Sequence, residues 1–193
     1  MLRYLTAGES HGPQLTAIIE GLPAGLAISE EAINIDLARR QCGYGRGGRM
    51  LIEKDEARPV SGIRFGKTIG SPITFIIENR DFKNWVKKMS ADPADSGAAE
   101  LVTRARPGHA DLAGVLKYNL PDIRDILERA SARETTARVA IGSLAKQILA
   151  PFGIDILGYV ASIGATEAIT PANLSVAELR RITEESQVRV ADP

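Results

Sequence analysis

The chain has 193 residues, of which 44% are apolar and 25% are charged, a composition typical of a globular protein. Its 24 basic and 24 acidic residues give a formal net charge of zero, which argues against a dedicated nucleic-acid binder. Cys42 is the single cysteine, so no disulfide can form within the chain, and no apolar run reaches the roughly 18 residues of a membrane span. We therefore expect one domain over residues 1–193, without a signal peptide, in the cytoplasm and with no membrane partner.

The first predicted elements are two strands, over residues 2–7 and 14–20. Glycine and proline occupy the turn positions between them, at 8–13. This pattern places Ser10 and His11 on a loop where two strands end. Loops held by a rigid scaffold are a common place for catalytic residues.

A helix is predicted next. Ser29 is a good N-cap, and Glu30 and Glu31 stand in the first turn, where the helix dipole favours acidic residues. We expect this helix to end near Arg40 or Gln41, ahead of a glycine-rich stretch.

That stretch, residues 43–49, is unusual in its charge. No acidic residue lies between Asp36 and Glu53, and glycines allow the backbone to approach a ligand closely. The region carries four arginines: Arg39, Arg40, Arg46 and Arg49. Because arginines without partners repel one another, the pattern favours an anion-binding segment over a solvated basic loop. An RNA-contacting loop is a further alternative, although Tyr44 is the one aromatic residue nearby.

The middle of the chain is predicted to contain β structure over 51–79 and then a polar surface excursion over 80–100. We expect Trp85, the only tryptophan, to pack this excursion down rather than to bind a cofactor. A second loop with glycine and proline follows and carries His109. Two short helices are predicted between 112 and 129.

A capping box is predicted where Ser131 and Glu134 stand three residues apart, ahead of an apolar run. In such a box the serine accepts from a backbone N–H of the first turn and the glutamate reaches back to the serine N–H. The helix is expected to run from Ser131 and to stop before Pro151.

Two arginines, Arg129 and Arg133, flank the predicted start of this helix. A helix N-terminus beside two guanidinium groups suits a phosphate or a carboxylate. The alternative is that these arginines pair with Glu128 and Asp125 on the surface.

The last third of the chain is predicted to contain a strand over 154–164 and then a helix. Ser175 and Glu178 form a second capping box, and the helix should end near Glu185.

The two histidines, His11 and His109, both lie in loops bounded by glycine and proline. Histidine can give or take a proton near neutral pH, which favours an acid–base role. No metal site is predicted, because no metal-ligand spacing is present. A serine hydrolase is disfavoured because Ser10 lacks the Gly-x-Ser-x-Gly motif. The residues thus indicate an enzyme acting on a multiply anionic small molecule.

The chain resembles the chorismate synthase family in four motifs that occur in the family's order. They are Gly8-Glu-Ser-His-Gly-Pro-Gln14, Gly43-Tyr-Gly-Arg-Gly-Gly-Arg-Met50, Arg106-Pro-Gly-His-Ala-Asp111 and Arg129-Ala-Ser-Ala-Arg-Glu-Thr135. The resemblance implies an α+β fold, a β-α-β sandwich of which this chain holds the first half. It also implies conversion of 5-enolpyruvylshikimate-3-phosphate to chorismate and phosphate by anti-1,4-elimination, with reduced FMN as cofactor.

The resemblance also implies residue roles. His11 would be the general acid at the leaving phosphate, and His109 would manage protonation of the flavin. The expected FMN contacts are Arg106, Arg129, Ala130 and Ser131. The expected substrate contacts are Ser10, Arg40, Arg49 and Arg133. Arg40 and Arg46 match positions assigned to NADPH in family members that reduce their own flavin.

Family members are about twice as long as this chain and usually form homotetramers. We therefore expect a fragment with both histidines and an incomplete flavin pocket. A fragment that only oligomerises, without catalysis, is the third alternative.

Overall fold

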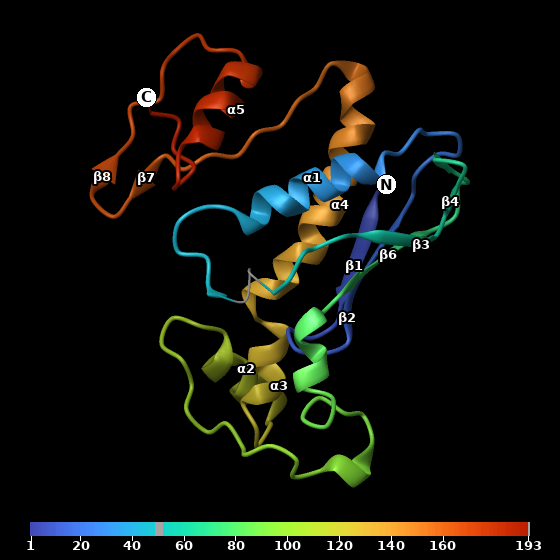
Figure 1. Cartoon of the computed structure of the whole chain (residues 1–193), viewed down its shortest axis with the longest axis vertical. Coiled ribbons are helices and arrows are strands. Elements are labelled where there is room, and N and C mark those ends of the chain that lie inside the picture. Colours follow the sequence, from blue (N-terminus) through green and yellow to red (C-terminus); the bar gives the residue numbers. More distant parts are fainter. Residues whose placement is uncertain (49–51, 193) are drawn as a thin grey trace.

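The structure, a computed structural model, describes residues 1–48 and 52–192, and its centre is a four-stranded antiparallel sheet (Figure 1). The strands lie in the order β1 (Arg3–Ala7), β2 (Gln14–Glu20), β6 (Ile73–Glu78) and β3 (Arg58–Ser61). The first two strands are sequence neighbours, whereas β6 joins β2 from more than fifty residues away. This crossing brings the segment after β6 close to the loop before β2.

One face of the sheet forms the core because apolar residues alternate along its two central strands. In the register of β2 and β6, Leu15 pairs with Ile77 and Ala17 pairs with Phe75. All four side chains are buried.

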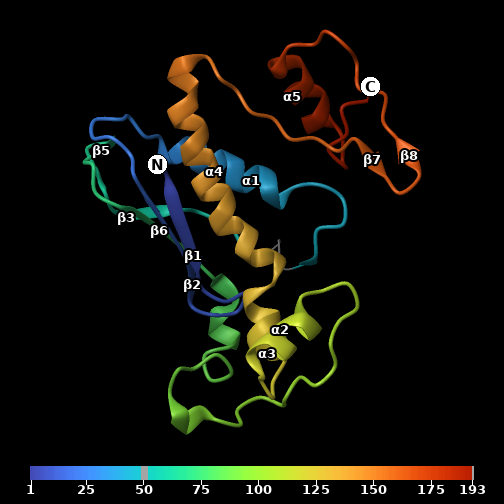
Figure 2. The same ribbon diagram turned by 180° about the vertical axis from the view of Figure 1, so that it is seen from behind.

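Two helices cover this face, α1 (Glu30–Gln41) and α4 (Thr135–Leu149), and Figure 2 shows α4 crossing the sheet with α1 beside it. The buried stripe of α1 is Ile33 and Leu37. Lys146 of α4 forms an ion pair with Asp36 of α1 at 2.8 Å, which fixes the two helices at the edge of the core.

The other elements lie on either side of this core. Residues 79–130 form an excursion at one end of the sheet, and residues 153–192 lie towards the other end of α4 (Figure 1). The excursion contains η2 (Arg80–Asn84), η3 (Pro93–Asp95), α2 (Asp111–Tyr118) and α3 (Arg124–Arg129), and η4 (Ala132–Glu134) connects it to α4. The remaining elements are β4 (Ile63–Arg64), β5 (Lys67–Thr68), η5 (Ala150–Phe152), β7 (Ser162–Ile163), β8 (Thr166–Glu167) and α5 (Val176–Glu185).

Several predicted elements are confirmed. The strand over 14–20 has the predicted bounds, and the Ser29 side chain accepts from the backbone N–H of Ala32 at the start of α1. Both hydrogen bonds of the capping box between Ser175 and Glu178 are present.

The strand predicted over 154–164 is wrong for most of its length. Within the described residues only Ser162–Ile163 pairs as a strand there, and Val160 makes a single bridge to Val190. Ile154 and Ile156 are exposed. Alternation alone does not make a strand here, because every second side chain stays exposed in the part of the chain that the structure describes.

Within residues 1–48 and 52–192, no helix is both long and apolar enough to cross a membrane.

Candidate active site

The loop between β1 and β2 carries Ser10 and His11, and a glycine sets its shape. Gly8 has a φ of +101°, and a Cβ atom there would lie 2.4 Å from the carbonyl oxygen of Gln14. Only glycine fits a position with both constraints. The loop therefore closes tightly at the end of the two strands, as the sequence predicts.

Two distant residues hold this loop in place. The side-chain amide of Asn79, just after β6, donates to the carbonyl oxygens of Glu9 (3.0 Å) and Gly12 (2.7 Å). The backbone N–H of Ser10 donates to the carbonyl oxygen of Glu128 at 3.0 Å. The loop is thus attached to both β6 and α3, and Ser10 is buried.

The His11 ring lies against three side chains. Its Nδ1 is 2.9 Å from both carboxylate oxygens of Glu128. Its face stacks on Trp85 with the ring centroids 4.0 Å apart and the planes at 27°. Its Nε2 is 3.9 Å from Asp81. The ring is therefore fixed on one edge and one face, and its side chain remains 21% exposed.

Trp85 does pack the excursion down, as predicted, and it does so against a candidate catalytic residue. Its indole N–H donates to Asp81 at 3.1 Å, and the Arg124 guanidinium lies 5.5 Å from the ring centroid. The contact between Trp85 and His11 was not foreseen from the sequence.

His109 has a more local setting. Its Nδ1 lies 3.0 Å from the Nη2 of Arg106 and 2.9 Å from Asp111. Asp111 is fully buried and accepts from the backbone N–H of Arg106 at 3.0 Å as well as from its guanidinium. The Arg106 hydrogen bond holds the pKa of the Asp111 carboxyl well below its usual range.

The His11 and His109 regions are electrostatically connected. Hydrogen bonding to Asp111 raises the pKa of Arg106 above its usual range, and the Glu128 carboxylate, the partner of His11, adds a smaller effect in the same direction. A glycine also sets the packing of α2 on α3, because a Cβ at Gly114 would lie 2.5 Å from the side chain of Ile126.

Arg129 ends α3, and Ala130 and Ser131 connect it to η4. Arg129 donates through Nη2 to the carbonyl oxygen (2.8 Å) and the hydroxyl (2.9 Å) of Thr6. Its Nη1 is buried and makes no hydrogen bond to the residues that the structure describes. A buried cationic donor without a protein acceptor suits an anionic ligand.

The capping box predicted at Ser131 forms only one of its two hydrogen bonds, and the helix does not start at Ser131. The Ser131 hydroxyl accepts from the backbone N–H of Arg133, but the segment that follows is a 3-10 turn, and α4 begins at Thr135. The Glu134 carboxylate bonds instead to the hydroxyl of Thr6 at 2.7 Å and to Arg138. Burial opposes ionisation of Glu134, and these partners outweigh it and lower the pKa. A charge-assisted pair is stronger than a bond to a backbone N–H.

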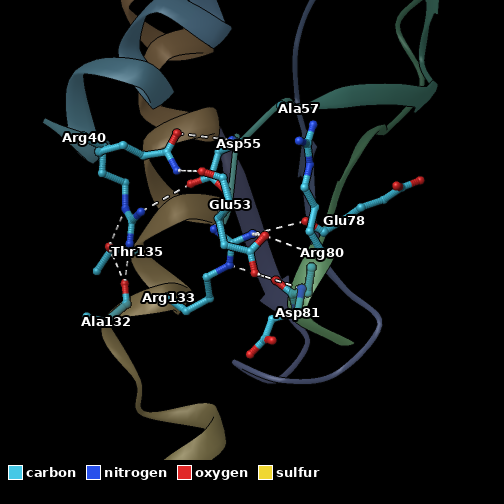
Figure 3. A network of polar contacts seen from close by, with 12 residues as sticks. Arg40, Glu53, Asp55, Ala57, Glu78, Arg80, Asp81, Ala132, Arg133 and Thr135 are labelled. Carbon is cyan, nitrogen blue, oxygen red and sulfur yellow. Dashed lines mark hydrogen bonds and ion pairs between the residues drawn. The ribbon is translucent and has the colours of Figure 1, made fainter. Parts of the chain in front are cut away.

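The surface-pairing alternative is wrong for Arg133, whereas Arg129 lies 3.6 Å from a carboxylate, that of Glu134. Arg133 is 3% exposed and forms ion pairs with Asp55 and Glu53. Its Nε donates to Asn79 at 2.8 Å, and its Nη2 donates to the Glu78 carbonyl at 3.2 Å. Figure 3 shows this buried network between η4, the end of β6 and the segment before β3. The network connects η4 to the residue that holds the His11 loop.

Arg40 reaches the same network from α1. It donates to the Ala132 carbonyl (2.7 Å), to the Thr135 hydroxyl (3.0 Å) and to Asp55 (3.4 Å) (Figure 3). Burial lowers the pKa of Arg40, and the Asp55 charge opposes that effect. The stretch around Arg40 contains no acidic residue, but the fold supplies Arg40 with partners from other parts of the chain. Arg40 is therefore not an unpaired cation.

The other arginines of this stretch have different kinds of partner. Arg39 pairs with Glu184 of α5, and Arg46 donates to the Cys42 carbonyl at 3.2 Å. Arg49 lies outside the described residues. A hollow of about 610 Å³ beside α4 is lined by polar and apolar residues. Its charged residues are Arg39, Arg40, Arg46, Arg138, Lys146 and Asp36, and Val139 and Ile156 are its larger apolar residues. This surface suits a phosphate-bearing ligand.

No group of three histidine, cysteine or acidic side chains converges as a metal site in the part of the chain that the structure describes.

Sequence reasoning missed the acidic partners of the site. Glu128 and Asp111 contact the histidines, and Asp55 contacts Arg40 and Arg133. Asp111 had a local signal, since it stands two residues after His109 in the same motif. Glu128 and Asp55 had none, because they reach their partners only through the fold.

Known proteins of one family match this chain throughout. The family model described as "Chorismate synthase" matches residues 2–193. Chorismate synthases from Geotalea uraniireducens and Enterococcus faecalis are 60% and 58% identical over 100% of this chain, which covers 49% and 50% of their lengths. A solved structure, "Crystal Structure of Chorismate Synthase", superimposes with a TM-score of 0.75 at 44% identity and covers 100% of this chain and 49% of that one. The chain spans about half the length of these relatives, its fold is the α+β fold of that structure, and it belongs to the chorismate synthase family.

Proposed function

We propose that the protein to which this chain contributes is a chorismate synthase that converts 5-enolpyruvylshikimate-3-phosphate to chorismate and phosphate with reduced FMN. Family membership supports the reaction class. The observation that carries the proposal is His11, a half-buried histidine bound through Nδ1 to a buried carboxylate, on a loop attached to a network that contains two arginines. Such a ring can deliver a proton from Nε2.

In this proposal His11 protonates the departing phosphate as the C–O bond breaks. Ser10 shapes the same loop and contacts the substrate. Arg40, with a partly exposed guanidinium, and Arg49 bind substrate anions. Arg133 adds positive charge to the site, and its contacts with Asp55 and Asn79 hold the site together.

Arg129, Ala130, Ser131 and Arg106 are the proposed contacts of FMN, with His109 beside it. Reduced FMN would supply electron density to the substrate as phosphate leaves. The buried Nη1 of Arg129, which makes no hydrogen bond to any described residue, is the protein feature that supports an anionic group there. Arg40 and Arg46, on the arginine-lined hollow, are the proposed contacts of NADPH if the protein reduces its own flavin. The proposed assembly is a homotetramer.

The test is anaerobic release of phosphate from 5-enolpyruvylshikimate-3-phosphate with chemically reduced FMN. It is run on the 193-residue chain and on a chimera in which this chain replaces the matching half of the Geotalea uraniireducens relative. We expect release by the chimera that disappears without FMN. The proposal is contradicted if the folded chimera releases no phosphate, or if it releases phosphate equally with and without FMN.

A further inference from the structure

We propose that Glu128 is a positioning residue that holds His11 in the tautomer with hydrogen on Nδ1, so that Nε2 is the nitrogen that exchanges a proton with the substrate. The consequence for catalysis rests on the proposed function. The tautomer itself is a property of this chain and is measured without any substrate.

The contacts of Nδ1 define the tautomer. Both oxygens of Glu128 lie 2.9 Å from this nitrogen, and an ionised carboxylate only accepts hydrogen bonds. Nδ1 must therefore carry the hydrogen, which leaves Nε2 without one in the neutral ring. The backbone N–H of His11 donates to the same carboxylate at 2.8 Å. One residue thus fixes both the main chain and the ring of His11.

The surroundings of Glu128 make this contact rigid. Its side chain is fully buried, and its own backbone carbonyl accepts a hydrogen bond from the Ser10 N–H. The charge of the carboxylate is balanced by Arg124, 3.8 Å away on the same helix. A buried carboxylate without such partners destabilises the fold, so the bond between Glu128 and His11 is maintained.

The other groups that face the ring do not compete for Nδ1. Asp81 is nearer to Nε2, at 3.9 Å, and it already accepts from the Trp85 indole and from Asn84. Trp85 stacks on the ring face and resists a rotation about the Cβ–Cγ bond that would replace Nδ1 by Cδ2 beside Glu128. The ring is therefore held with its Nδ1 edge towards Glu128.

This arrangement decides which proton moves. The protonated ring carries hydrogen on both nitrogens, and the Nδ1 hydrogen belongs to the bond with Glu128. The Nε2 proton can pass to a departing phosphate oxygen while the electron pair of the breaking C–O bond stays with that oxygen. The neutral ring that remains has the tautomer that Glu128 already holds, so the proton leaves without rearrangement.

The test is two-bond ¹H–¹⁵N correlation NMR of the chain labelled with ¹⁵N-histidine, at a pH where the rings are neutral. The chain has only two histidines, so two sets of ring signals are expected, and His109→Gln assigns them. We expect Nδ1 of His11 to give the signal of a nitrogen that bears hydrogen. A wild-type His11 with hydrogen on Nε2 overturns the proposal.

Variants identify the responsible residue. Glu128→Gln keeps the size of the side chain, and its amide group next to Nδ1 is expected to weaken or reverse the preference. Glu128→Ala removes the acceptor altogether. Asp81→Asn is the matched control, because it makes the same change at the other ring nitrogen and should leave the tautomer unchanged. If Glu128→Gln and a folded Glu128→Ala both keep the wild-type tautomer, Glu128 does not position the ring.

Turnover of the chimera separates this inference from the proposed function. We expect Glu128→Gln to lower kcat by about 10²-fold, within the range that a positioned proton donor contributes, with little change in KM. Glu128→Asp should recover part of the loss. If the tautomer changes as expected and turnover does not, the positioning role in catalysis is overturned. An inactive wild-type chimera contradicts the proposed function and leaves the tautomer result standing.

Discussion

The two histidines come from similar sequence motifs, and the fold treats them differently. The Nδ1 of His11 is held by Glu128, 117 residues away, and its ring face is covered by Trp85. The Nδ1 of His109 is held by Arg106 and Asp111, which stand within three residues of it. His11 therefore depends on the tertiary structure, whereas the geometry of His109 is largely set by its own loop.

This difference predicts how each histidine responds to amino-acid substitutions around it. A change in the buried network should disturb His11 first, because Asn79 connects the His11 loop to Arg133. A change in the Arg106 loop should disturb the geometry of His109 and leave the hydrogen bonds of His11 in place.

The largest effect is expected for Arg133→Met. This change removes the buried guanidinium that pairs with Asp55 and Glu53 and leaves Asp55 with the longer contact to Arg40, which should lower the free energy of unfolding by about 3–5 kcal/mol. Urea unfolding followed by circular dichroism measures the loss. Arg138→Met is the matched control, since that guanidinium is exposed and pairs with Glu134 on the surface. If both variants unfold at the same urea concentration, the network does not stabilise the His11 region.

The next effect is expected in turnover. His11→Ala in the chimera should lower phosphate release by about 10²- to 10⁴-fold, the contribution of a positioned acid, in a variant that still folds. Turnover within a few-fold of wild type would exclude the acid role. His109→Ala should lower turnover as well, and if its role is at the flavin, the loss should come with altered spectra of bound FMN.

The local parts of this picture were predictable from the sequence. Alternation over 14–20 predicts a strand with one buried face, and the Ser29 and Ser175 caps depend on residues within three positions. The pairing of Glu128 with His11 was not predictable, because it requires the positions of β1, β2 and α3 together.

The capping box at Ser131 shows the same limit from the other side. The sequence pattern is present, yet β1 brings the Thr6 hydroxyl to the Glu134 carboxylate, and Arg138 pairs with it one turn later. Tertiary partners replaced the local bond. Among the residues that the structure describes, no tertiary partner bonds to the Glu178 carboxylate, and the Ser175 box forms in full.

A smaller effect is expected for Arg129→Ala. Loss of a charged donor should weaken FMN binding by about 1.5–3 kcal/mol, or about 10- to 100-fold in Kd, and should weaken substrate binding less. Fluorescence titration with FMN measures the first and isothermal calorimetry with substrate the second, both on the chimera. Arg3→Ala is the control, because Arg3 forms an exposed ion pair with Glu20 on the same strand pair. Equal losses for both ligands would assign Arg129 to the substrate instead.

The smallest effect is expected at Asp111, and it tests the claim that the His109 region is set locally. Arg106 lowers the pKa of Asp111 in the folded chain, so ionised Asp111 stabilises the fold at pH values above the unfolded pKa of about 3.9. That contribution is lost as the pH falls from there through the lower folded pKa. The ¹³C shift of the Asp111 carboxyl should therefore stay that of an ionised group at pH values where other aspartates are protonated. Arg106→Ala should return the Asp111 titration towards the usual range while the tautomer of His11 stays unchanged.

If Asp111 titrates normally in the wild-type chain, the Arg106 bond does not hold this loop. If Arg106→Ala changes the His11 tautomer, the two regions are coupled more strongly than the contacts of the folded chain imply.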